Sequence, residues 1–97
     1  QLDQAMVDCT EMIARSPHIA FGYDSRGRVH LLAGRLDAAI ADFDTALKMH
    51  ARIASALYGR GIAKRRKGDA TGAAVDDVAA RLINADIAEE MAIYGLR

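Results

Sequence analysis

The sequence of 97 residues matches itself at an offset of 34 residues. Between segments 20–53 and 54–87, nine positions carry the same residue, most of them alanine or glycine. The register continues beyond both segments, from Ala5 to Ala39 and from Gly61 to Gly95. A fixed period of this length is typical of repeat proteins, in which each unit buries its apolar face by stacking on its neighbours. We therefore expect a single domain over residues 1–97, with a partial unit at 1–19, full units at 20–53 and 54–87, and a terminal part at 88–97.

Each unit is expected to contain two helices. Alanine supplies 20 of the 97 residues, whereas there is one proline and no tryptophan, so the composition favours an all-α fold. Pro17 ends the first helix, Gly34 and Gly68 are expected as left-handed caps, and Asp69 is expected as an N-cap. The expected helices cover residues 3–15, 18–33, 36–49, 52–67, 70–84 and 87–94. Because their connections are short, consecutive helices are expected to pack as antiparallel neighbours.

The residues at the repeated positions resemble those of the tetratricopeptide repeat. That family places a large residue, Leu-Gly and Tyr on its first helix, followed by Ala, an aromatic residue, Ala and a closing Pro on its second. The first full unit supplies Tyr23, Arg26, Gly27, His30, Ala39, Phe43, Ala46 and Ala51. The second supplies Leu57, Arg60, Gly61, Lys64, Ala73, Asp77, Ala80 and Ala85, and the partial unit supplies Ala5, Cys9, Met12 and Pro17.

The resemblance covers nearly the whole chain, with clear departures. Arginine replaces the usual leucine in both full units, His30 and Lys64 replace the tyrosine, Asp77 replaces the aromatic residue, and alanine replaces the closing proline. The terminal Ile-Tyr-Gly-Leu resembles the bacterial branch of the family. The resemblance implies a right-handed α-α superhelix, a TPR solenoid of antiparallel helix pairs with a short C-terminal capping helix.

Two arginines recur at a position that normally packs in the core. An arginine in a packed interface needs an anionic partner. Arg26 is expected to pair with Asp8 or Asp42, and Arg60 with Asp42 or Asp76. Such pairs would be structural.

Two glycines recur inside helices, where glycine costs about 1 kcal/mol relative to alanine. Gly27 and Gly61 therefore predict a close crossing of a neighbouring helix, with Ala39 and Ala73 on the partner side.

No catalytic or metal-binding constellation is recognisable. His18, His30 and His50 fall in three separate segments, and no zinc-type spacing is present. Cys9, the only cysteine, is expected as a small buried residue of the first helix. Adjacent carboxylates on a helix point about 100° apart, so they form no general acid–base pair. The sequence therefore predicts no enzyme, no cofactor and no metal site.

Charge and hydrophobicity exclude further classes of protein. Thirteen Lys and Arg residues balance thirteen Asp and Glu residues, which argues against a dedicated nucleic-acid binder. The basic run Lys64–Lys67 is typical of a helix C-terminus, although contact with a phosphate backbone or an acidic partner stays open. No apolar run is long enough to predict a membrane span. A bacterial source is favoured, and the compartment, cytoplasm or periplasm, stays open.

The resemblance implies that the first helix of each unit lines a concave face that holds a peptide or a partner helix. The predicted function is a non-catalytic protein-interaction or scaffold module. The groove residues expected on this face are Phe21, Asp24, Arg28, Leu31, Tyr58, Ile62, Arg65 and Glu89. Some family members hold a terminal carboxylate with Lys and Asn, but the only asparagine here is Asn84.

The first helix lacks a partner helix within its own unit. Its apolar residues Leu2, Met6 and Ile13, with Cys9, are expected to be partly uncovered, so a homodimer through this helix is a second hypothesis. Because the sequence begins at Gln1 rather than Met, an alternative function is a dimerisation or regulatory appendage of a larger enzyme encoded upstream.

Overall fold

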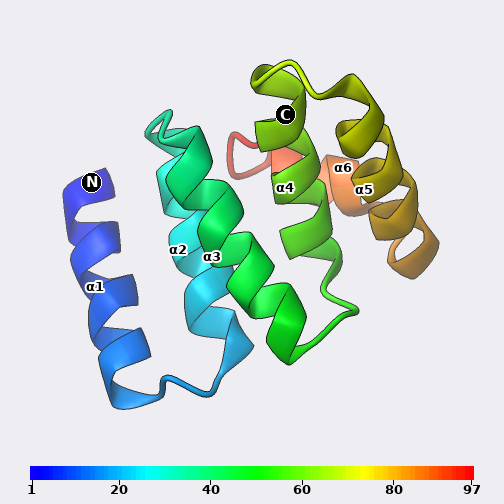
Figure 1. The fold of residues 1–97 in the computed structure, drawn as a ribbon. Coiled ribbons are helices and arrows are strands. Elements are labelled where there is room, and N and C mark those ends of the chain that lie inside the picture. Colours follow the sequence, from blue (N-terminus) through cyan, green and yellow to red (C-terminus); the bar gives the residue numbers. More distant parts are fainter.

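The computed structural model describes residues 1–97 and contains six α-helices and no strand (Figure 1). The helices are α1 (Leu2–Arg15), α2 (Ala20–Leu32), α3 (Leu36–Met49), α4 (Ala54–Arg66), α5 (Ala70–Ile83) and α6 (Ile87–Ala92). All six expected helices are therefore confirmed. α2 and α4 begin slightly later than expected because Ile19 and Ile53, directly before them, keep an extended backbone.

Three glycines with left-handed backbone close helices. Gly34 has φ 80° and Gly68 has φ 94°, which confirms both expected caps. Gly95, with φ 83°, closes the helical turns after α6, where the Leu96 N–H donates to the Met91 carbonyl at 3.1 Å. This closure explains why α6 is shorter than expected. Asp69 is also confirmed as an N-cap, since its carboxylate accepts from the Gly72 N–H at 2.9 Å.

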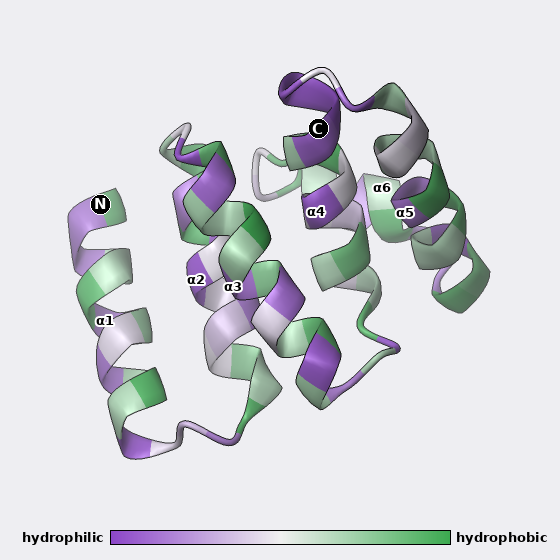
Figure 2. Ribbon diagram, viewed as in Figure 1, coloured by the Kyte–Doolittle hydropathy of each residue, from purple (hydrophilic) through white to green (hydrophobic).

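Consecutive helices from α1 to α5 run in opposite directions and pack side by side, as expected (Figure 1). α1 contacts α2 alone, whereas α2 also contacts both α3 and α4. α6 lies behind α4 in this view and contacts α4 and α5. The molecule measures 34 × 24 × 22 Å. Figure 2 shows hydrophilic and hydrophobic residues alternating along the helices, with the hydrophilic C-terminal end of α4 at the top.

The core is centred on Phe43 of α3. A Cβ atom added at Gly27 would lie 2.7 Å from the Phe43 ring, and one added at Gly59 would lie 2.5 Å from it. The ring is therefore held between a glycine of α2 and a glycine of α4. The close crossing expected at Gly27 is confirmed, because Phe43 belongs to α3, the helix that also carries Ala39; the atoms nearest to Gly27 are those of the Phe43 ring.

The expectation for Gly61 is confirmed. A Cβ at this position would meet the Ala73 carbonyl oxygen at 3.2 Å, so the backbones of α4 and α5 approach closely here.

None of the helices combines the length and the hydrophobicity needed to cross a bilayer.

Candidate functional site

Two arginine–aspartate pairs join the helices in the same way. Arg26 donates from Nε to Asp42 Oδ2 at 2.7 Å and from Nη2 to Oδ1 at 2.9 Å. Arg60 donates from Nε to Asp76 Oδ2 and from Nη2 to Oδ1, both at 2.8 Å. The predicted pairing is confirmed, with Asp42 and Asp76 as the partners. Each fork is bidentate and partly buried, which makes it stronger than an exposed ion pair.

Arg60 has a further partner that the sequence analysis missed. Its Nη1 donates to Asp44 Oδ1 at 2.9 Å, so one guanidinium group binds carboxylates of both α3 and α5. Lys64 also approaches Asp76, at 3.1 Å. Burial alone would raise the pKa of Asp76, but the hydrogen bonds from Arg60 and Lys64 lower it below its ordinary value. Every charge in this cluster has a partner, so we assign the cluster a structural role.

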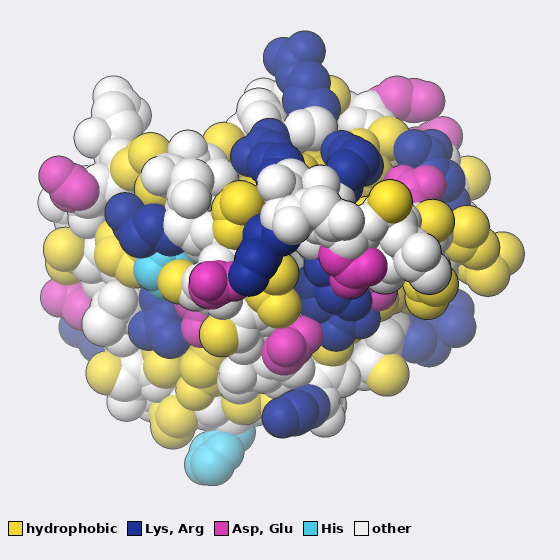
Figure 3. Space-filling view, turned by 45° about the horizontal axis from the view of Figure 1, so that its top comes forward, with side chains coloured by type: hydrophobic (Ala, Val, Ile, Leu, Met, Phe, Trp, Pro, Cys, Tyr) yellow, Lys and Arg dark blue, Asp and Glu magenta, His cyan; other side chains and the backbone are white.

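The basic run at the end of α4 is largely occupied within the chain. Lys64 pairs with Asp76, Lys67 with Asp37, and Arg66 donates to the Arg97 carbonyl at 3.0 Å. Figure 3, in which the top of the view in Figure 1 comes forward, shows Lys and Arg side chains with Asp and Glu side chains among them. These contacts favour the interpretation of the run as a charged helix end.

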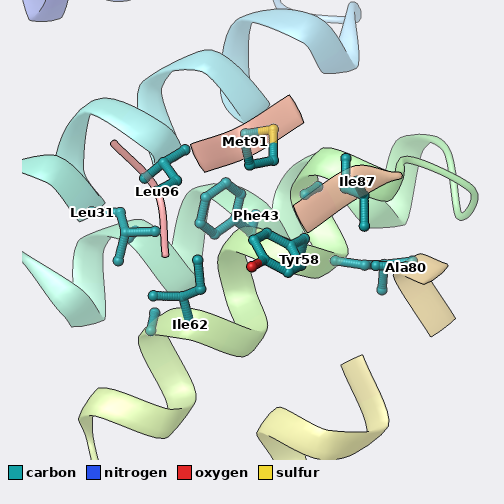
Figure 4. Packing of buried hydrophobic residues seen from close by; sticks show 12 residues of the cluster. Leu31, Phe43, Tyr58, Ile62, Ala80, Ile87, Met91 and Leu96 are labelled. Carbon is teal, nitrogen blue, oxygen red and sulfur yellow. The ribbon is translucent and has the colours of Figure 1, made fainter. Parts of the chain in front are cut away.

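The face of α2 and α4 covered by the chain's last residues is here called the inner face. It contains half of the predicted groove residues, namely Asp24, Arg28, Leu31 and Ile62. Residues 87–97, the C-terminal segment, cover this face with α6 and the turn that follows it (Figure 1). Leu96 is 1% exposed and lies in one apolar cluster with Leu31 and Ile62, which are 0% and 1% exposed (Figure 4). Met91 belongs to the same cluster.

Beneath this segment lies a polar group that the sequence analysis did not identify as a cluster. Asp24 is only 3% exposed, and its Oδ2 accepts from the Ser55 hydroxyl at 2.7 Å. Arg28 approaches the same oxygen at 3.8 Å. Asp24 Oδ1 and Arg28 Nε are buried and have no hydrogen-bond partner. Burial raises the pKa of Asp24, although Ser55 and Arg28 oppose the shift.

Two surface hollows flank this polar group, and both have Tyr94 in their walls. The first measures about 220 Å³ and is lined by Cys9, Ser25, Arg28, Val29, Leu32, Tyr94 and Leu96. The second measures about 390 Å³ and is lined by Ser55, Asn84, Ile87, Glu90, Met91, Ile93 and Tyr94. Arg28 thus borders one hollow, and the hydrogen-bond partner of Asp24 borders the other. The C-terminal segment lies between these two openings.

The predicted groove residues have different surroundings. Leu31 and Ile62 are buried in the core, so they offer no surface to a partner while the C-terminal segment is in place. Asp24 is likewise buried, and Arg28 is partly exposed. Phe21 and Glu89 are exposed and line none of the hollows.

Tyr58 and Arg65 are brought together in a hollow of about 300 Å³ between α4 and α5. Arg65 is exposed there, whereas Tyr58 is buried and belongs to the core cluster.

The residues of α1 predicted to self-associate are only partly uncovered. Leu2 is exposed, Met6 and Ile13 are half-buried, and Cys9 is buried as expected. Ile13 packs on α2, since a Cβ added at Gly22 would lie 3.0 Å from its side chain. Burial raises the pKa of the Cys9 thiol.

No three His, Cys, Asp or Glu side chains converge in a way that could hold a metal ion. His30 instead accepts from Arg35 Nε at 3.0 Å through Nδ1, with Nε2 placed 3.5 Å from Asp42. Burial lowers the pKa of His30.

In comparisons with known proteins, no family model matches this chain, and no curated protein matches it.

Proposed function

We propose that the chain is a tetratricopeptide-like solenoid that acts as a non-catalytic protein-interaction or scaffold module, with α6 as its C-terminal cap. The proposed partner is a peptide or a protein segment that binds the inner face. The observation that carries this proposal is the recurrence of one bidentate ion pair, with the same atoms, 34 residues further along the chain.

Further regularities support the same interpretation. α4 and α5 repeat the lengths of α2 and α3 at an offset of 34 residues, and Gly68 repeats the left-handed cap of Gly34. A stack of helix pairs presents an extended surface, and mixed apolar and arginine surfaces are typical of recognition. The hollow beside Tyr58 and Arg65 and the two hollows beside the C-terminal segment supply such a surface.

Selection of a displayed random-peptide library against the full chain tests this function. We expect recovered peptides to bind in solution, and Arg28→Ala, which changes a residue of the inner face beside Leu96, to weaken them. Arg52→Ala is the matched control, because it removes the same charge from an exposed residue outside these hollows. If both variants reduce the affinity of the selected peptides equally, or if the library yields no enriched peptides, the proposal is contradicted.

A dimerisation role has one observation of its own in its favour. α1 packs only on α2, and its Val7 is 51% exposed. Light scattering over a range of concentrations tests whether the chain self-associates and whether Val7→Asp abolishes this. A monomer at every concentration would leave the inner-face proposal as the better one.

A further inference from the structure

We propose that the C-terminal segment is an intramolecular occupant of the inner face, and that it competes there with an extended peptide carrying a large aliphatic residue. This inference rests on the proposed function. It assigns both the chemistry of the partner and the element that regulates access to the site.

The first argument is the position of Leu96. Its side chain is buried against the apolar cluster that holds Leu31 and Ile62, and Met91 joins it from α6 (Figure 4). This part of the inner face therefore accommodates aliphatic side chains from an irregular segment. Without the segment, the apolar surface of α2 and α4 would face water and would favour another segment of similar chemistry.

The second argument is that the segment has little helical structure of its own and is anchored in the core by three side chains, those of Ile87, Met91 and Leu96. α6 has only 6 residues, which is too short to be stable without packing. After α6, the Arg97 carbonyl accepts a hydrogen bond from the exposed Arg66. Ile93 and Tyr94 remain exposed, at 81% and 63%. Such a segment can leave while the longer helices stay folded.

The third argument is what the segment leaves unsatisfied. Asp24 Oδ1 is a buried acceptor and Arg28 Nε a buried donor, and neither has a partner. An extended peptide offers both a backbone N–H and a carbonyl, so it can satisfy atoms that the C-terminal segment does not. A competing peptide therefore needs an aliphatic side chain for the position of Leu96 and a backbone carbonyl for Arg28, which lines the hollow beside Leu96.

Cys9 provides a direct probe, since it is the only cysteine and lines the same hollow as Leu96. We expect iodoacetamide to alkylate Cys9 roughly tenfold faster in the full-length Leu96→Ser variant than in the wild type, because the variant loses an apolar anchor. Ile93→Ser is the matched control, because it makes the same kind of change at an exposed position of the same segment. Equal rates in the two variants, with helical circular dichroism retained, would overturn the proposal.

A measurement on the wild type keeps the test decisive if the Leu96 variant does not fold. The Leu96 amide donates to the Met91 carbonyl. We expect this amide hydrogen to exchange with solvent when the C-terminal segment opens locally, while the amides of α2 and α4 stay protected. Exchange of this amide only by global unfolding would overturn the proposal.

A synthetic peptide of residues 87–97 tests competition. It is expected to bind Leu96→Ser at least about tenfold more tightly than the wild type and to slow the alkylation of Cys9. Arg28→Met in the Leu96→Ser background should leave the affinity for this peptide unchanged, since the segment makes no hydrogen bond to Arg28. The same change should weaken the binding of a peptide selected from the library.

Equal affinity of selected peptides for the wild type and Leu96→Ser would contradict competition while leaving the proposed function intact. Binding of only the 87–97 peptide would support the segment's role and contradict a separate partner.

Discussion

At the residue scale, the structure depends on how each buried charge is satisfied. The recurrence of Arg26 and Arg60 predicted paired carboxylates, because a guanidinium group in a packed interface requires them. The position of Asp24 could not be predicted in this way. Its hydrogen-bond partner Ser55 lies on another helix, and the pair does not recur at the period of the chain.

Loss of Arg60 should destabilise the fold. Arg60→Met leaves the buried Asp76 with Lys64 as its remaining cationic partner, so we expect the free energy of unfolding to fall by about 2–3 kcal/mol. Urea denaturation measures this change. Asp44→Asn is the control, since Asp44 is more exposed and its loss should cost less than about 1 kcal/mol. Equal effects of the two variants would contradict the central role of the Arg60–Asp76 pair.

Asp24 and Asp76, whose pKa values are shifted in opposite directions, should affect the stability of the fold in separate pH ranges. Burial raises the folded-state pKa of Asp24, so its contribution to stability should decrease as the pH rises above the unfolded value of 3.8. The pKa of Asp76 is lowered, so its contribution is fully present above 3.8 and is lost as the pH falls through the folded-state value.

Urea denaturation from about pH 3 to about pH 7 checks both effects. Asp24→Asn should abolish the decrease above pH 3.8, and Asp76→Asn should abolish the loss below it. If the curve of either variant runs parallel to that of the wild type, the corresponding assignment is wrong.

At the element scale, local signals predicted the helices well. Glycines with left-handed backbone, the cap at Asp69 and the proline at 17 each act within one turn of the chain, so their effects can be read from sequence. The cover over the inner face could not be predicted, because Leu96 reaches Leu31 only after the four intervening helices, α3 to α6, have packed. The predicted groove therefore included Glu89 of this segment as a lining residue, without the cover that the rest of the segment forms.

The glycines around Phe43 allow a test at this scale. Gly59→Ala should be destabilising by about 1–3 kcal/mol, because the added Cβ overlaps the Phe43 ring and this outweighs the better helix propensity of alanine. Phe43→Leu is destabilising by itself, but the double variant should lose less than the sum of the single losses. Additive losses in this double-mutant cycle would contradict the steric explanation.

At the scale of the whole molecule, the helices differ in how many neighbours support them. α1 has one neighbouring helix, whereas α4 contacts α2, α3, α5 and α6. Stability is therefore expected to be uneven along the chain.

Native-state hydrogen exchange should reveal this difference. Amides of α1 should exchange faster than those of α3 and α4, through openings that leave the Phe43 cluster intact. Uniform protection across all the helices would indicate one cooperative unit and contradict this expectation. Dimerisation through α1 would slow its exchange as the protein concentration rises, which provides the control.

The contact of Arg60 with both Asp44 and Asp76 has a consequence for cooperativity. Arg26 binds a carboxylate of its own helix pair, but Arg60 also binds one of the preceding pair, α2–α3. In a one-dimensional description of stacked helix pairs, this contact belongs to the nearest-neighbour coupling and not to the intrinsic stability of either pair. Because such a coupling is mutual, the α2–α3 and α4–α5 pairs each fold more favourably beside the other, so this contact favours unfolding of the two pairs as one unit.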